Sequence, residues 1–139
     1  DALGPAPSWT AARAQAFAER LDQDGRVMAD NLARLHAAGV RVVAGTDAGN
    51  PLTLHGPSML PELLAMQAAG LSAMDVLVAA TRDAADALGR PDLGRIQAGA
   101  VADLLILDAD PSADIGALQT LTHVIRAGTV HTRTTLIPD

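Results

Sequence analysis

The sequence predicts an α/β fold, with helices around one buried strand followed by a segment of short strands. Three observations support this prediction. Apolar residues recur at helical spacing from Trp9 to Ala38, a β-branched run follows over residues 40–46, and strand-like pieces alternate with turns from Gly94 onward. The chain has 139 residues and is 49% hydrophobic, which is enough to form a core.

Composition excludes several classes of partner and site. The net charge is -6 and the isoelectric point about 4.9, which argues against nucleic acid as a main partner because phosphate binding needs a basic face. Cysteine is absent, so disulfides and thiolate metal sites are excluded. No apolar run reaches the roughly 18 residues that span a membrane. The first residue is Asp1 and no signal peptide precedes it, so we expect a cytoplasmic protein and a processed, cleaved or truncated chain.

The first predicted helix covers residues 9–38. Ser8 is its expected N-cap, and Gly39 is the glycine expected after its last turn. Gly25 interrupts the apolar pattern, so the sequence allows either one long helix weakened there or two helices that meet there. His36 lies at the edge of the apolar stripe, which favours a structural role over a ligand role.

The run over residues 40–46 is typical of a strand buried on both faces, as in a parallel sheet. Asp47 falls where this strand stops, and chemistry in α/β folds lies at the carboxyl ends of strands. Asp47 is therefore a functional candidate. The alternative, equally open on this residue alone, is that it caps a turn.

Three further helices are predicted over residues 57–70, 73–80 and 81–89. Ser72 and Asp75 resemble a capping box at the start of the second, and the third begins with a threonine that can cap it. We expect the last two of these helices, over residues 73–80 and 81–89, to serve packing alone.

Three strands are predicted after Gly94, over residues 101–107, 122–126 and 130–134. His123 and His131 lie in or beside the last two. The two histidines could form a metal-binding pair if the strands align them. The favoured interpretation is that both are exposed strand residues.

Several short motifs follow one another in a fixed order along most of the chain. They are Ala38-Gly39-Val40-Arg41-Val42-Val43-Ala44-Gly45-Thr46-Asp47-Ala48-Gly49, His55-Gly56, Ala79-Ala80-Thr81 with Ala84-Ala85, Leu88-Gly89, Gly94-Arg95-Ile96, Ala102-Asp103-Leu104 and Val124-Ile125-Arg126-Ala127-Gly128. This ordered set resembles the metal-dependent amidohydrolase superfamily, and its imidazolonepropionase-like and prolidase-like members most closely.

The resemblance implies a (β/α)8 TIM barrel and a small β-sandwich built from both chain ends. Residues 40–46 are then the last barrel strand and residues 57–89 the helices after it. Residues 1–93 are expected to be the C-terminal part of the barrel, and residues 94–139 the C-terminal part of the sandwich.

The resemblance also implies roles for single residues. Asp47 matches the family's aspartate that binds the metal or its water and shuttles a proton. His55 lies in the loop at the active-site face, where it either contacts substrate or fixes the entry to the next helix. Asp103 is expected to be structural, tying its strand to the preceding Gly99 turn.

The family's His-x-His pair, its lysine and its two further histidines have no counterpart here, and a full barrel takes about 250 residues. We therefore expect the C-terminal part of a hydrolase that cleaves C–N bonds in small amide, peptide-like or cyclic amide substrates with a divalent metal, zinc first. The missing ligands come from an absent N-terminal part or another copy of the chain, so this chain alone is expected to be inactive. The alternative is a non-catalytic subunit or relict that acts only in association.

Overall fold

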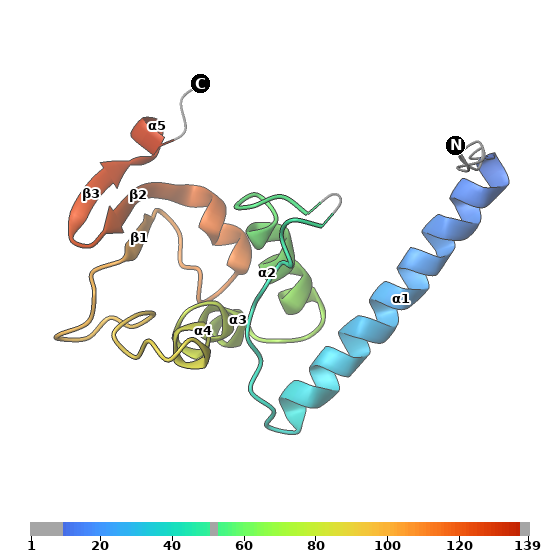
Figure 1. The fold of residues 1–139 in the computed structure, drawn as a ribbon, viewed down its shortest axis with the longest axis horizontal. Coiled ribbons are helices and arrows are strands. Elements are labelled where there is room, and N and C mark those ends of the chain that lie inside the picture. The colour runs from blue at the N-terminus through green and yellow to red at the C-terminus, as the bar shows by residue number, and fades with distance from the viewer. Residues whose placement is uncertain (1–9, 51–52, 137–139) are drawn as a thin grey trace, which may run out of the picture.

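The computed structural model describes residues 10–50 and 53–136. Figure 1 shows one long helix at the side of the molecule, a group of shorter helices in the middle and a small sheet at the far end. The elements are α1 (Ala11–Ala37), α2 (Met59–Ala68), α3 (Ala73–Ala80), α4 (Arg82–Ala87), β1 (Leu104–Leu107), the 3-10 helix η1 (Ile115–Thr120), β2 (Leu121–Arg126), β3 (Thr129–Thr132) and α5 (Arg133–Leu136). No helix within these ranges is long and apolar enough to cross a membrane.

The first helix is continuous, so Gly25 does not divide it. A single glycine costs only about 1 kcal/mol in a helix interior, which the remaining turns offset. Thr10 is the N-cap, and its hydroxyl accepts a hydrogen bond of 3.3 Å from the backbone three residues on. The predicted cap, Ser8, lies outside the described residues. The helix ends as expected, with Gly39 at a φ of +77°.

The three middle helices are confirmed, with one difference in capping. The Ser72 hydroxyl accepts from the backbone N–H of Asp75 at 3.1 Å and donates to its carboxylate at 2.5 Å, so the predicted capping box forms. Thr81 does not cap α4 with its side chain. Its hydroxyl instead donates to the carbonyl of Leu77 at 2.6 Å, back into α3.

The strand predicted over residues 40–46 is not formed within the described part of this chain. A strand needs a neighbour, and no described strand lies beside this segment; Ala44 N–H instead donates to the Ala79 carbonyl of α3 at 3.2 Å. Even-numbered residues from 42 to 48 are half-buried, whereas odd-numbered residues from 41 to 47 are exposed. The expected burial on both faces is therefore not found within this chain: one face packs on the helices and the other is open.

One apolar core joins the middle helices to the C-terminal segment. Its buried members are Leu63, Met66, Leu71, Ala73, Val76, Ala79 and Ile115. Ile115 comes from η1, an element that the sequence pattern did not predict, and its side chain is 0% exposed. The Gln67 side-chain carbonyl accepts a hydrogen bond of 3.1 Å from the Ile115 N–H, which ties η1 to α2.

The C-terminal strands form one antiparallel sheet in the order β1-β2-β3, within slightly different bounds from those predicted. The hairpin turns at Ala127 and Gly128, whose φ angles of +47° and +81° are typical of a type I′ turn. Asp103 is structural as expected, but its carboxylate accepts from Ala127 N–H at 2.6 Å. The expected tie to Gly99 is thus wrong, because the sheet brings Asp103 to the hairpin turn. The β-sandwich stays a prediction.

Candidate functional site

Asp47 lies on the open face of the segment that precedes α2. Its φ of +50° is a left-handed conformation that aspartate tolerates better than most residues. The side-chain amide of Asn50 donates to the Asp47 carboxylate at 2.6 Å and to the Asp47 backbone carbonyl at 3.2 Å. Asp47 therefore presents an exposed carboxylate whose orientation is fixed from one side.

The loop after Asp47 is organised by backbone hydrogen bonds. Gly49 N–H donates to the Thr53 carbonyl at 3.1 Å, and Thr53 N–H donates to the Asn50 carbonyl at 3.0 Å. A Cβ built on Gly49 would lie 3.9 Å from Nε2 of His55. The structure thus brings the exposed imidazole of His55 beside the loop that carries Asp47.

The described part of the chain holds no group of three or more His, Cys, Asp or Glu side chains able to bind a metal ion. His123 pairs with Thr132 and His131 pairs with Val124, so the two imidazoles project from opposite faces of the sheet. The metal-pair alternative is therefore wrong, and both histidines are half-buried rather than exposed. Asp47 fits a divalent metal as one carboxylate ligand, whereas a catalytic zinc takes about three protein ligands.

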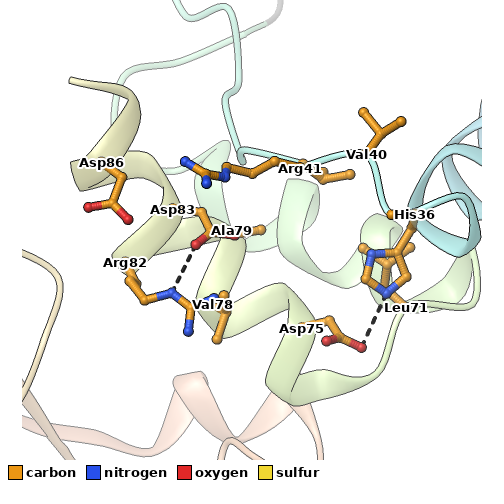
Figure 2. Close-up of a pocket in the computed structure, with 12 residues that line it drawn as sticks. His36, Val40, Arg41, Leu71, Asp75, Val78, Ala79, Arg82, Asp83 and Asp86 are labelled. Atoms are coloured by element: carbon orange, nitrogen blue, oxygen red, sulfur yellow. Dashed lines mark hydrogen bonds and ion pairs between the residues drawn. The ribbon is translucent and has the colours of Figure 1, made fainter. Parts of the chain in front are cut away.

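A pocket of about 420 Å³ lies at the other end of the same segment, near Gly39 and Arg41 (Figure 2). It is lined by charged side chains of α3 and α4, most of which are paired. His36 Nε2 lies 3.4 Å from the Asp75 carboxylate, which agrees with a structural role for this histidine. The pKa of Asp75 is lowered, first by the hydrogen bond from Ser72 and then by the nearby His36.

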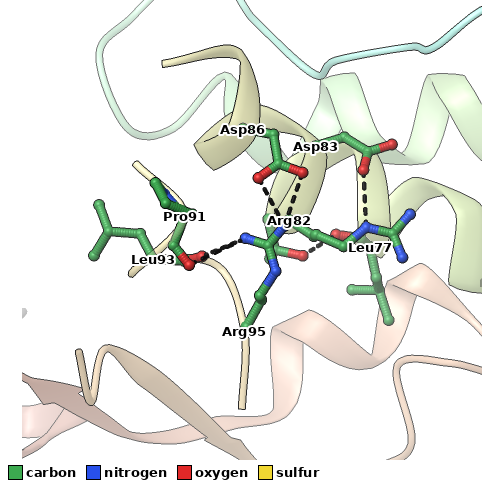
Figure 3. Close-up of polar contacts among 8 residues, drawn as sticks. Leu77, Arg82, Asp83, Asp86, Pro91, Leu93 and Arg95 are labelled. Carbon is green, nitrogen blue, oxygen red and sulfur yellow. Dashed lines mark hydrogen bonds and ion pairs between the residues drawn. The ribbon is translucent and has the colours of Figure 1, made fainter. Parts of the chain in front are cut away.

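A charged clamp joins α4 to the loop that leads into the sheet (Figure 3). Arg95 donates to both carboxylate oxygens of Asp86 at 2.7 Å and to the Leu93 carbonyl at 3.2 Å. The hydrogen bonds from Arg95 to the Asp86 carboxylate lower the pKa of Asp86. Gly94 has a φ of +68°, and a side chain there would overlap the Thr81 carbonyl.

Sequence reasoning missed the roles of Asn50 and Arg95. Asn50 was visible only as half of an Asn-Pro turn, although an amide three residues after a strand-end acid can hydrogen-bond back to it. Arg95 belongs to a motif quoted for the resemblance, but its partner Asp86 lies nine residues upstream, on another element.

Comparisons with known proteins agree on one family. The model of the amidohydrolase family matches residues 12–132. An uncharacterised protein of Mycobacterium tuberculosis is 40% identical over 119 residues, which is 86% of this chain and 29% of that protein. An imidazolonepropionase of Xanthomonas oryzae pv. oryzae is 44% identical over 88 residues, which is 60% of this chain and 21% of that enzyme.

A solved structure gives the same answer. The crystal structure of a Xaa-Pro dipeptidase with methionine bound in its active site superposes with a TM-score of 0.67 at 30% identity, covering 75% of this chain and 25% of the dipeptidase. The chain thus spans less than a third of each of these three proteins. Because the family match extends over both the helices and the sheet, the chain belongs to the amidohydrolase family.

Proposed function

We propose that the chain is the C-terminal part of a metal-dependent enzyme that hydrolyses C–N bonds in small amide, peptide-like or cyclic amide substrates. The observation that carries the proposal is the Asp47 carboxylate, which stands exposed on the open face of its segment and is held by Asn50. The names of the relatives, an imidazolonepropionase and a Xaa-Pro dipeptidase, agree with this substrate class.

Asp47 is the residue of this chain that does chemistry in the proposal. A divalent metal, zinc first, supplies a water whose pKa is lowered toward about 7 when it is bound. The Asp47 carboxylate would be one ligand of that metal, and it would accept the proton of the attacking water and pass it to the leaving nitrogen. His55, beside the same loop, contacts the substrate.

The architecture of the complete enzyme is part of the same proposal. The open face of residues 41–47 supports an assignment of residues 40–46 as the last strand of a TIM barrel, because the odd-numbered side chains point away from α2 and α3. Residues 1–93 then belong to the barrel and residues 94–139 to a β-sandwich. The remaining metal ligands come from an N-terminal part of the enzyme or from another copy of the chain, and the location is cytoplasmic.

The test uses the complete enzyme that contains this chain. Asp47→Asn keeps the shape of the side chain but cannot accept the proton, so kcat should fall by about 10²–10⁴-fold with the fold intact. Asp30→Asn is the matched control, since Asp30 is exposed on α1. Near wild-type kcat in Asp47→Asn with metal bound overturns the proposal, as does the absence of metal-dependent hydrolysis from the wild-type enzyme.

A further inference from the structure

We propose that Asn50 is a positioning residue, which fixes the Asp47 carboxylate in the orientation that the reaction needs. The inference rests on the proposed function, because it concerns the same carboxylate. Nothing in the sequence pattern or in the family comparison assigns this role to Asn50, and the geometry of the loop points to it.

The first step is the contact itself. The Asn50 Nδ2 group lies 2.6 Å from Asp47 Oδ2, a short distance that is typical of hydrogen bonds to a charged acceptor. The Asn50 nitrogen can only donate, so Asp47 Oδ2 is the acceptor of this hydrogen bond. Among the described residues no donor reaches Asp47 Oδ1. One oxygen is thus restrained, and the other is left for the reacting partner.

The second step is that Asn50 is itself held. Its backbone N–H donates to the Asp47 carbonyl at 3.4 Å, and its carbonyl accepts from Thr53 N–H at 3.0 Å. The same Nδ2 group also reaches the Asp47 carbonyl at 3.2 Å. The amide therefore bridges the backbone and the side chain of Asp47, so a rotation of the carboxylate breaks a contact that the loop keeps in place.

The third step is the conformation of Asp47. Its φ is +50°, a left-handed backbone conformation that most residues avoid, and this conformation sets the direction in which the side chain leaves the backbone. Such a conformation persists where the surroundings determine it. The two hydrogen bonds from the Asn50 amide stabilise this conformation of Asp47. Because one bond goes to the backbone carbonyl and the other to the carboxylate, they link the unusual backbone to the direction of the carboxylate.

Two variants in the complete enzyme separate positioning from loop formation. Asn50→Asp keeps the size of the side chain and its preference for turns but removes the donor, whereas Asn50→Gly removes the side chain and keeps a permissive backbone. Groups that orient a metal ligand affect activity or metal affinity by about 10–100-fold when they are removed. We therefore expect kcat to fall by about 10–100-fold in both variants, with KM within about twofold of the wild type.

Metal retention gives a readout that does not depend on turnover. Competition with a chelator, using zinc alone as the probe, should show binding about 10–100-fold weaker in Asn50→Gly, while the melting temperature stays that of the wild type. The matched control is Asn31→Asp, because Asn31 is exposed on α1 and should leave kcat, zinc retention and melting unchanged.

The outcomes distinguish this inference from the proposed function. If Asp47→Asn loses turnover but both Asn50 variants keep wild-type kcat and zinc retention, the positioning role alone is overturned. It is also overturned if kcat falls only in step with a lowered melting temperature, because Asn50 then serves loop stability. If Asp47→Asn keeps wild-type turnover, the proposed function falls and the inference falls with it.

Discussion

Replacement of Ile115 tests whether the 3-10 helix completes the core. The side chain is 0% exposed and packs with α2 and α3. Ile115→Ala removes about three buried carbons, worth ~0.8 kcal/mol each by transfer. The cavity that remains adds to this cost, and measured Ile→Ala changes in cores reach about 2–5 kcal/mol. We expect the free energy of unfolding to fall by about 3 kcal/mol for Ile115→Ala and by about 1 kcal/mol for Ile115→Val.

The assay is urea denaturation followed by far-ultraviolet circular dichroism, with the slope of the transition checked for constancy. The matched control is Ile96→Ala, because Ile96 is 90% exposed and should cost less than about 0.5 kcal/mol. Equal losses of unfolding free energy at the two positions would refute the reasoning, because the burial of Ile115 would then contribute nothing to stability.

Three further changes test other contacts by urea denaturation. Gln67→Ala should lower the free energy of unfolding by about 1–3 kcal/mol, because the buried N–H of Ile115, which donates to the Gln67 side chain, loses its hydrogen-bond partner. The lowered pKa of Asp86 means that its pair with Arg95 stabilises the fold above about pH 4 and loses this effect as the pH falls through the folded pKa, so Arg95→Gln should flatten the acid side of the stability profile. Gly94→Ala should destabilise more than Gly99→Ala, because both glycines have positive φ but only Gly94 meets backbone atoms; equal costs would contradict the overlap.

Local signals predicted the helices well. The capping box at Ser72 and the glycine after the first helix depend on residues three or four positions apart, which a sequence displays directly. The 3-10 helix at Ile115–Thr120 escaped prediction although Asp114 caps it locally, because its burial depends on residues distant in the sequence. Its first N–H binds a side chain of α2, and its first residue is buried by helices far away in the chain.

The segment over residues 40–46 shows a second limit of prediction from sequence, because here the local pattern favoured an element that does not form within the chain. Its composition is that of a buried strand, yet a strand is a property of a pair, and the described residues supply no second member. For the site, the position of Asp47 after a β-branched run was readable from the sequence. The bond from Asn50 was not, because it depends on the left-handed backbone at Asp47 that turns the amide back onto the carboxylate.

The contact between Gln67 and Ile115 also sets an order of events during synthesis. The two residues are 48 positions apart, so α2 and α3 leave the ribosome well before the residue that closes their core. Contacts of this sequence separation form late, because the loop between them must close first. During that interval the nascent chain carries an unfilled apolar site between two finished helices. Expression yield should therefore respond to the speed of translation between residues 68 and 115, and to chaperones that cover apolar surface in that interval.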